Sequence, residues 1–262
     1  MPLRSVMKPF FVVLSVLAVT LVYIGCTESE EEVTYADTEY PYMTIVGSDF
    51  IGSKDAFNTW YNETHIPLLM QYPGLMEAVR FQNSAEGAKP EFLAMYYYNT
   101  LEDLNGMGTS AAMDTANKEL AEHWQNDEYS LNLAVRYEKI KSWVKADYTG
   151  DLEVATLVGV EITAGMEDAV NDWYNNTHIP LIMKYPGIKK SIRYKKLEGG
   201  VNTDSLPTYI AVYYYPTAED KASQNTSEEW QAVLADMEEQ TVDDNMTPPK
   251  VIGMNEIFLI SK

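Results

Sequence analysis

The chain has 262 residues, of which 46% are hydrophobic, so it can form one or two domains that each have a core. Its formal net charge is −20, which argues against nucleic-acid binding, because that binding needs basic patches to neutralise phosphates. The single cysteine, Cys26, excludes an internal disulfide and a multi-cysteine metal site.

The segment 1–25 is typical of a signal peptide. It carries two basic residues near its start, and the run from Phe10 to Gly25 carries no charge. An apolar run this short fits a signal-peptide core better than a membrane-spanning helix. The following Cys26 resembles the lipidated cysteine of a bacterial lipoprotein. Tyr23 departs from the small aliphatic residue usual in that pattern, so an ordinary secretory signal and a membrane anchor stay open.

Residues 26–41 are expected to form an acidic tether. Six carboxylates and no basic residue lie between Thr27 and Pro41, and such a segment stays solvated. An acidic run directly after a lipidated cysteine also resembles the surface-export signal of Bacteroidetes lipoproteins. We therefore expect the protein to be anchored in the bacterial cell envelope through an N-terminal lipid, at the outer membrane and facing outward.

A fifteen-residue motif occurs twice in the chain. WYNETHIPLLMQYPG begins at Trp60 and WYNNTHIPLIMKYPG begins at Trp173, with twelve identical positions. The offset of 113 residues is close to the length of a small domain. Two of the three histidines, His65 and His178, occupy equivalent places in the motif. Packing alone rarely requires the same polar residue twice, so we look for function here.

Both halves of the chain predict the same order of elements. Apolar and β-branched runs predict four strands in each half. In the first half these strands are 42–47, 75–82, 91–98 and 131–140. In the second half they are 154–161, 188–197, 208–215 and 251–260. With a helix after the first and third strands, each half follows the ferredoxin-like βαββαβ plan, an antiparallel sheet with helices on one face.

The first helix of each half contains the repeated motif. Apolar residues recur at spacings of three and four from Phe57 to Leu68 and from Val170 to Leu181, as on one face of a helix. Pro67 and Pro180 predict a kink or a break just after each histidine. The second helices are expected at 110–124 and 227–240, and residues 143–151 are expected to link repeats 42–147 and 152–262.

The motif resembles the EthD-like branch of the dimeric α/β-barrel superfamily, in which a helix carries an aromatic pair, a histidine and a proline. The matching residues are Trp60, Tyr61, His65 and Pro67, and again Trp173, Tyr174, His178 and Pro180. The resemblance implies an α+β fold in which two tandem ferredoxin-like repeats pack sheet to sheet as an intrachain barrel, a pseudo-dimer within one chain. Such packing would cover the face of each sheet that its helices leave bare.

The superfamily includes monooxygenases, cyclases, isomerases, decarboxylases and haem enzymes, so this fold does not fix a reaction. His65 and His178 are the candidate catalytic residues, because an imidazole titrates near neutral pH and can act as a general acid or base. The alternative is a buried histidine that bonds to a backbone carbonyl and holds the kink.

The residues expected to bind a substrate are aromatic side chains and arginines. They are Trp60, Tyr61, Arg80, Tyr96 and Tyr98 in the first half, and Trp173, Tyr174, Arg193, Tyr213 and Tyr215 in the second. An arginine could anchor an anionic substrate or lie at the solvent edge of a strand. The tryptophans could belong to the core, and the tyrosines could line a cavity or pack under the helices.

No phosphate loop, nucleophile elbow or HExxH motif occurs in the sequence. Two distant histidines with no cysteine nearby make a poor metal site, so we expect neither a metal nor a cofactor. The resemblance leaves open haem ligation by His65 or His178.

Three functions remain open. The first is cofactor-free acid/base or oxygenation chemistry on a small hydrophobic or aromatic molecule. The second is a non-catalytic lipoprotein that binds such a ligand, and the third is a structural part of the envelope.

Overall fold

The structure is a computed structural model that describes residues 40–124, 128–146, 148, 152–242 and 244–262. The predicted signal peptide, the lipidation site at Cys26 and nearly all of the acidic tether lie outside these residues. Within the described part of the chain, no helix is both long enough and apolar enough to span a membrane.

The first half of the chain contains four strands and two pairs of helices. The strands are β1 (Tyr42–Phe50), β2 (Leu75–Asn83), β3 (Phe92–Tyr98) and β4 (Tyr129–Val144). The helices are α1 (Lys54–Trp60), α2 (Ile66–Leu69), α3 (Leu101–Met107) and α4 (Ala111–His123). A π-helical turn, η1 (Tyr61–His65), joins α1 to α2.

The second half has the same order of elements. The strands are β5 (Val154–Val160), β6 (Lys190–Val201), β7 (Tyr209–Tyr215) and β8 (Lys250–Ser261). The helices are α5 (Glu167–Trp173), α6 (Ile179–Ile182), α7 (Ala218–Ser223) and α8 (Glu228–Val242). The π turn η2 (Tyr174–His178) joins α5 to α6, and short 3₁₀ turns follow β6 and precede α8.

All the predicted strands and long helices occur close to their expected positions. Two differences stand out. Strand β4 continues through Trp143 and Val144, which we had assigned to the link, because Trp143 is fully buried and pairs with β6. The short helices α3 and α7 were not predicted, because six or seven residues are too few to show a helical period; each begins at a threonine that caps it.

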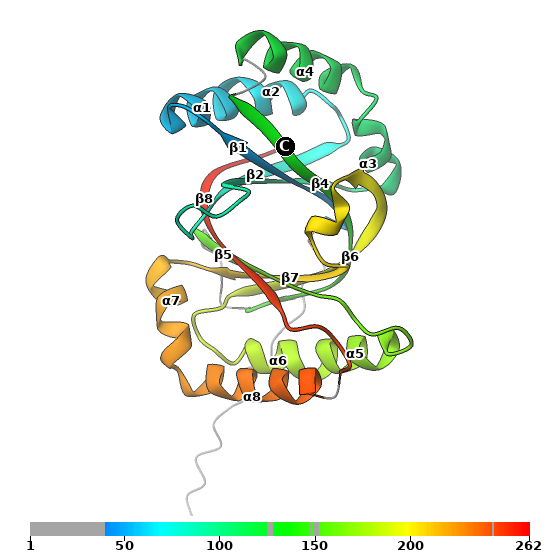
Figure 1. Cartoon of the computed structure of the whole chain (residues 1–262), viewed down its shortest axis with the longest axis vertical. Coiled ribbons are helices and arrows are strands. Elements are labelled where there is room, and N and C mark those ends of the chain that lie inside the picture. The colour runs from blue at the N-terminus through cyan, green and yellow to red at the C-terminus, as the bar shows by residue number, and fades with distance from the viewer. Residues whose placement is uncertain (1–39, 125–127, 147, 149–151, 243) are drawn as a thin grey trace, which may run out of the picture. The chain divides into compact units, whose positions relative to one another are not determined.

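The eight strands form one closed barrel in the order β1-β3-β2-β8-β5-β7-β6-β4, and every neighbouring pair is antiparallel. The two halves meet through β2–β8 and β4–β6, so no strand is left as an open edge. The helices of each half lie outside the barrel at opposite ends of the view in Figure 1. The predicted α+β barrel within one chain is therefore confirmed.

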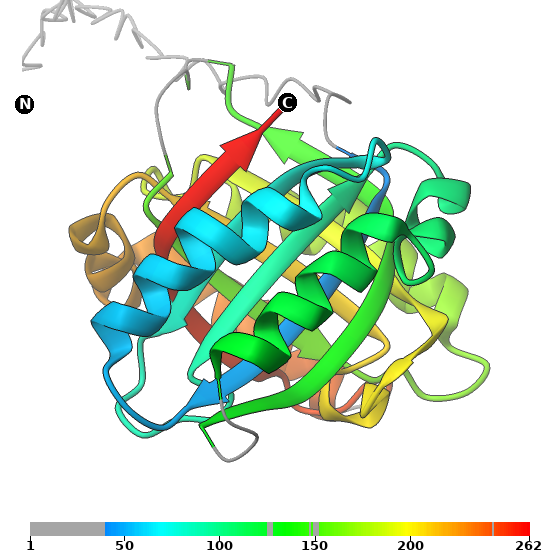
Figure 2. The same cartoon turned by 90° about the horizontal axis from the view of Figure 1, so that it is seen from above.

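The barrel interior is filled by side chains of both halves. Tyr97 and Tyr214 meet there with their hydroxyls 3.3 Å apart. The neighbouring tyrosines face outward, under the helices: Tyr96 and Tyr98 in the first half, Tyr213 and Tyr215 in the second. Figure 2 shows the helices of the first half lying across this outer face. The outward tyrosines therefore lie between the sheet and the helices that cover it.

Candidate functional site

The repeated motif forms a continuous helix with a π turn in the middle. The Ile66 N–H bonds to the Tyr61 carbonyl, five residues back, and the backbone angles of Trp60, His65 and Ile66 are helical. Pro67 has no N–H to donate, and its ring would clash with the carbonyl four residues back in a regular helix. The wider turn relieves that clash, so the expected kink or break takes the form of a π turn. Such turns are frequent at functional sites.

Arg80 holds this π turn on the sheet. Its guanidinium donates to Asn62 Oδ1 at 2.6 Å and to Asn58 Oδ1 at 2.9 Å, and it stacks 4.1 Å from the centre of the Tyr61 ring. Arg193 repeats the arrangement with Asn175, Asn171 and Tyr174. Both arginines are 1% exposed, so neither lies at the solvent edge. The asparagine pairs, four residues apart in both copies, were a signal in the sequence that we did not use.

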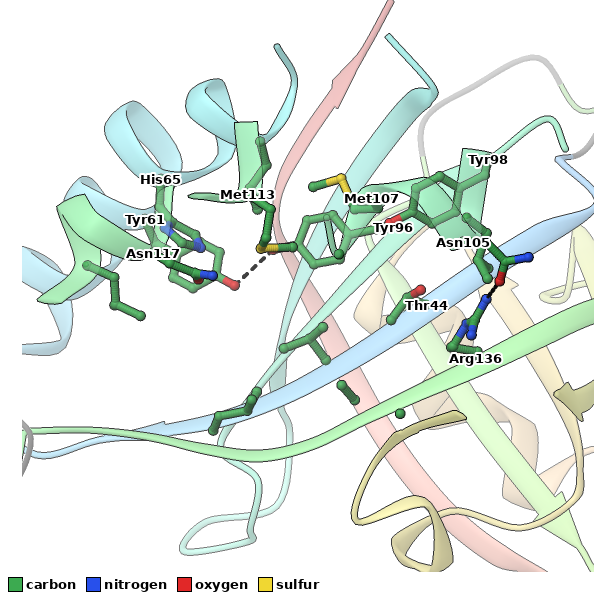
Figure 3. Close-up of a pocket in the computed structure, with 18 of the residues that line it drawn as sticks. Thr44, Tyr61, His65, Tyr96, Tyr98, Asn105, Met107, Met113, Asn117 and Arg136 are labelled. Carbon is green, nitrogen blue, oxygen red and sulfur yellow. Dashed lines mark hydrogen bonds between the residues drawn. The ribbon is translucent and has the colours of Figure 1, made fainter. Parts of the chain in front are cut away.

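A pocket of about 380 Å³ lies between the sheet and the helices of the first half. Four of the predicted site residues line it: Tyr61, His65, Tyr96 and Tyr98. Trp60 and Arg80 do not line it, and neither do the predicted residues of the second half. The polar residues that we did not predict are Thr44, Asn105, Asn117, Tyr129 and Arg136. Figure 3 shows His65, Tyr61 and Asn117 at one end, and Asn105 and Arg136 at the other.

His65 is a neutral imidazole at the pocket wall. It is 7% exposed, and its Nδ1 is buried with no hydrogen-bond partner among the described residues. Its ring packs against Trp60 and Tyr61, with ring centres 5.1 Å and 4.8 Å away. Burial lowers the pKa of His65 to about 4, and the positive charge of Arg80 acts in the same direction. At neutral pH this histidine can accept a proton or a hydrogen bond.

Two tyrosine hydroxyls meet beside His65. Tyr61 and Tyr96 are 2.8 Å apart at their hydroxyl oxygens, and burial raises the pKa of both. Both phenols are therefore neutral, and the pair carries two hydroxyl protons, of which one forms the bond between them. The other proton can be donated to a molecule in the pocket.

His178, the counterpart of His65, has a different environment. It is 1% exposed, and its Nδ1 lies 2.5 Å from Asp236 Oδ2. The other oxygen of Asp236 accepts from Trp173 Nε1 at 3.1 Å. Burial lowers the pKa of His178 more than Asp236 raises it, so a neutral ring donates to the carboxylate. In the first half Glu119 accepts from Trp60 at 2.7 Å, but it does not reach His65.

Larger side chains stand at two corresponding positions in the second half. Met113 and Trp230 hold equivalent places, because each donates its backbone N–H to the serine that caps α4 or α8. By the same register Val233 stands where the first half has Ala116, and both are buried. Two copies of one motif thus have one histidine beside a pocket and one in a packed hydrogen-bonded pair.

Neither histidine suits haem iron. His178 is enclosed, with Nδ1 bonded to Asp236 and the Trp173 ring centre 4.6 Å away. A metal-bound histidine normally donates its other ring N–H to a carboxylate, carbonyl or water, and the buried Nδ1 of His65 has no such partner in the described chain. The described residues also contain no group of three or more metal-binding side chains.

The fold occurs in known structures, although no family model and no curated protein matches the chain. A monooxygenase candidate from Lactobacillus acidophilus shares 10% identity and a TM-score of 0.56, over 85% of this chain and 97% of its own. An anthrone oxidase-like protein shares 12% identity and a TM-score of 0.56, over 87% and 95%. A chlorite dismutase variant from Candidatus Nitrospira defluvii shares 8% identity and a TM-score of 0.52, over 84% and 92%. At these identities the likeness shows the α/β-barrel fold alone.

Proposed function

We propose that the first-half pocket is the active site of a cofactor-free enzyme that acts on a small hydrophobic or aromatic molecule. The observation that carries this proposal is the buried, neutral His65, which faces a pocket of about 380 Å³ beside the Tyr61–Tyr96 hydroxyl pair. An acceptor for a proton and a donor to an oxyanion are the two groups that removal of a proton next to a carbonyl requires.

In the proposed reaction His65 removes a proton from an acidic C–H of the substrate. The free proton of the Tyr61–Tyr96 pair bonds to the carbonyl oxygen, where negative charge develops. Because the pKa of His65 is about 4, it is a weak base, so the substrate must be one whose anion is well stabilised, such as an aromatic ketone.

Oxygenation is the proposed continuation of this step. The electron-rich carbanion reacts with dioxygen, and in the overall balance one methylene group and one O₂ give a carbonyl group and one water. Two proteins of similar fold, the monooxygenase candidate and the anthrone oxidase-like protein, support the choice of oxygenation for this proposal. The parallel places of Arg80 and Arg193 on two π turns support a tandem duplication of an EthD-like ferredoxin-like unit, in which only the first copy keeps the site.

The alternative is a non-catalytic lipoprotein that holds a small ligand in the same pocket. Anthrone is a suitable probe of both functions, because its methylene is acidic and its oxidation to anthraquinone consumes one O₂. We expect the purified protein to accelerate oxygen uptake with anthrone. His65→Gln should lower turnover by at least about 10²-fold, while His178→Asn, which keeps a donor for Asp236, should stay within about threefold.

Each outcome decides between the two functions. Binding of anthrone without turnover by the unmodified protein would identify a binding protein. Equal losses in the two variants, at matched thermal stability, would contradict the assignment of the chemistry to His65. For the location of the protein we keep the proposal of an envelope lipoprotein anchored through Cys26, which rests on the N-terminal sequence.

A further inference from the structure

The end of the pocket away from His65 contains a single cation. Arg136 lies on β4 and is half buried in the pocket lining. One nitrogen of its guanidinium donates to Asn105 Oδ1 on α3, and another donates to the Glu198 carbonyl at 3.4 Å. A guanidinium has five N–H donors, so further donors stay available for a ligand.

Arg136 has no carboxylate partner in the described part of the chain, although the chain has a formal net charge of −20. Asn105 accepts the arginine with its oxygen, which leaves its amide NH₂ as a second donor at the same place. A fixed guanidinium beside an amide donor matches the two oxygens of a carboxylate.

Local backbone geometry makes room for this cation. Gly199, on the neighbouring strand β6, has φ +86°, and a Cβ built there would lie 3.0 Å from Arg136 Nη1. A residue with a side chain would be strained at that angle and would crowd the guanidinium. The glycine therefore keeps the guanidinium in its place at the end of the pocket.

The middle of the pocket is apolar and aromatic. Between the two polar ends Figure 3 shows Tyr96, Met107 and Met113, and the apolar lining also includes Leu69, Leu104 and Leu120. Methionine adapts to irregular shapes and makes favourable contacts with aromatic rings. This part of the pocket suits the flat apolar body of a ligand.

The second half lacks both anchor residues. The β-pairing places Arg136 opposite Thr44, and in the second half Gly253 stands opposite the corresponding Thr156. By the register of the capping threonines of α3 and α7, Ala222 stands where the first half has Asn105. The two corresponding positions of the second half thus carry neither the cation nor its amide partner.

From these contacts we infer that the ligand is an aromatic carboxylate, with its acid group on Arg136 and Asn105 and the opposite edge of its ring system at His65. This inference names the substrate class of the proposed active site and rests on that proposal for the role of His65. The anchoring of the acid group depends only on the pocket and on Arg136.

The test compares carboxylic acids with their neutral amides, in single-ring, naphthalene and biphenyl series that have no acidic C–H. Titration calorimetry on the unmodified protein should show that at least one carboxylate binds about tenfold or more tightly than its carboxamide. Arg136→Gln should remove this preference and leave the carboxamide affinity unchanged. Lys184→Gln changes the net charge equally at an exposed position outside the pocket and should keep the preference.

Equal binding of acid and amide, binding of neither in any series, or an unchanged preference in Arg136→Gln would overturn the inference. Because these probes cannot be deprotonated at carbon, the result is independent of turnover. If the protein prefers carboxylates but shows no turnover, only the proposed enzymatic function is contradicted. If turnover depends on His65 but the protein shows no preference for carboxylates, only the proposed binding of the acid group by Arg136 is contradicted.

Discussion

At the scale of single residues, two histidines with the same neighbours in sequence have different chemistry. His178 donates to Asp236 and is packed on every side, whereas the Nδ1 of His65 has no partner in the described chain. The carboxylate that bonds to His178 belongs to Asp236 on α8, which lies 58 residues later in the sequence. By the register of the capping serines, Glu119 of α4 corresponds to Asp236 of α8, and Glu119 accepts from Trp60 without a hydrogen bond to His65 Nδ1.

The depressed pKa of His65 predicts a loss of stability in acid. The unfolded chain takes up this proton from about pH 6.5 downward, but the folded chain does so only near pH 4. The neutral form is the one that the fold favours, so stability is unaffected above pH 6.5 and falls between pH 6.5 and 4. Between pH 7.5 and 5 the free energy of unfolding should fall by about 2 kcal/mol through this residue.

Urea unfolding of the unmodified protein and of His65→Gln at both pH values measures this effect. The variant should lose about 2 kcal/mol less than the unmodified protein over the same interval. Carboxylates contribute equally to both proteins and cancel in the difference. Parallel losses in the two proteins would show that burial does not depress the pKa of His65.

At the scale of elements, the second helix of each half places a different side chain over the sheet. α4 presents Met113 to the sheet, and α8 presents Trp230 at the same place. The π turns are alike in both halves. The hydrogen bonds from Arg80 and Arg193 to the asparagines of these turns also have the same distances. These arginine contacts therefore position the histidine in both copies. The packing of the covering helix determines what the histidine can contact.

Met113→Trp should close the pocket. Since Met113 borders open space, the larger ring should fit with less than the cost of about 1–3 kcal/mol that overpacking of a filled core carries. Affinity for an aromatic carboxylate should fall at least about tenfold, measured by calorimetry. The matched control is Trp230→Met, which should lower the thermal midpoint through a cavity and leave affinity unchanged. Unchanged affinity in a folded Met113→Trp protein would place the ligand elsewhere.

At the scale of the whole molecule, the two halves share one core. The barrel interior joins residues such as Met43 and Ile45 to Ile192 and Val212, all of them fully buried. Because the last strand pairs with both β2 and β5, the end of the chain closes the first half as well as the second. The two halves thus share one barrel and differ in the helices that cover their outer faces.

The prediction that Cys26 anchors the protein in the cell envelope through a lipid concerns the whole chain. Expressed from residue 1 in a bacterium with an outer membrane, the protein should partition into detergent and carry an acylated N-terminal cysteine, measured by phase separation and mass spectrometry. Cys26→Ala should move it to the aqueous phase. An unlipidated N-terminus, or the same partitioning in the variant, would contradict the lipoprotein assignment.

The sequence by itself determined the repeat, the strands and the long helices, and it determined that Tyr96 and Tyr98 share one face of their strand. These features depend on local periodicity: alternation in the run from Tyr96 to Tyr98 separates inside from outside, and apolar spacing marks the helix that carries His65. The barrel was predicted from the resemblance to the dimeric α/β-barrel superfamily, and the bare faces of the two sheets supplied a physical reason for it.

The tertiary structure alone decided which predicted residues line the pocket. Arg80 and Arg193 are predicted from the sequence to bind a substrate but lie buried under helices, whereas Arg136, for which the sequence predicts no role, lines the pocket. Alternation shows which face of a strand a side chain takes, but not which helix covers it or how much room that helix leaves. That room depends on the volumes of side chains far apart in sequence, such as Met113 and Trp230, and only their packing in space determines it.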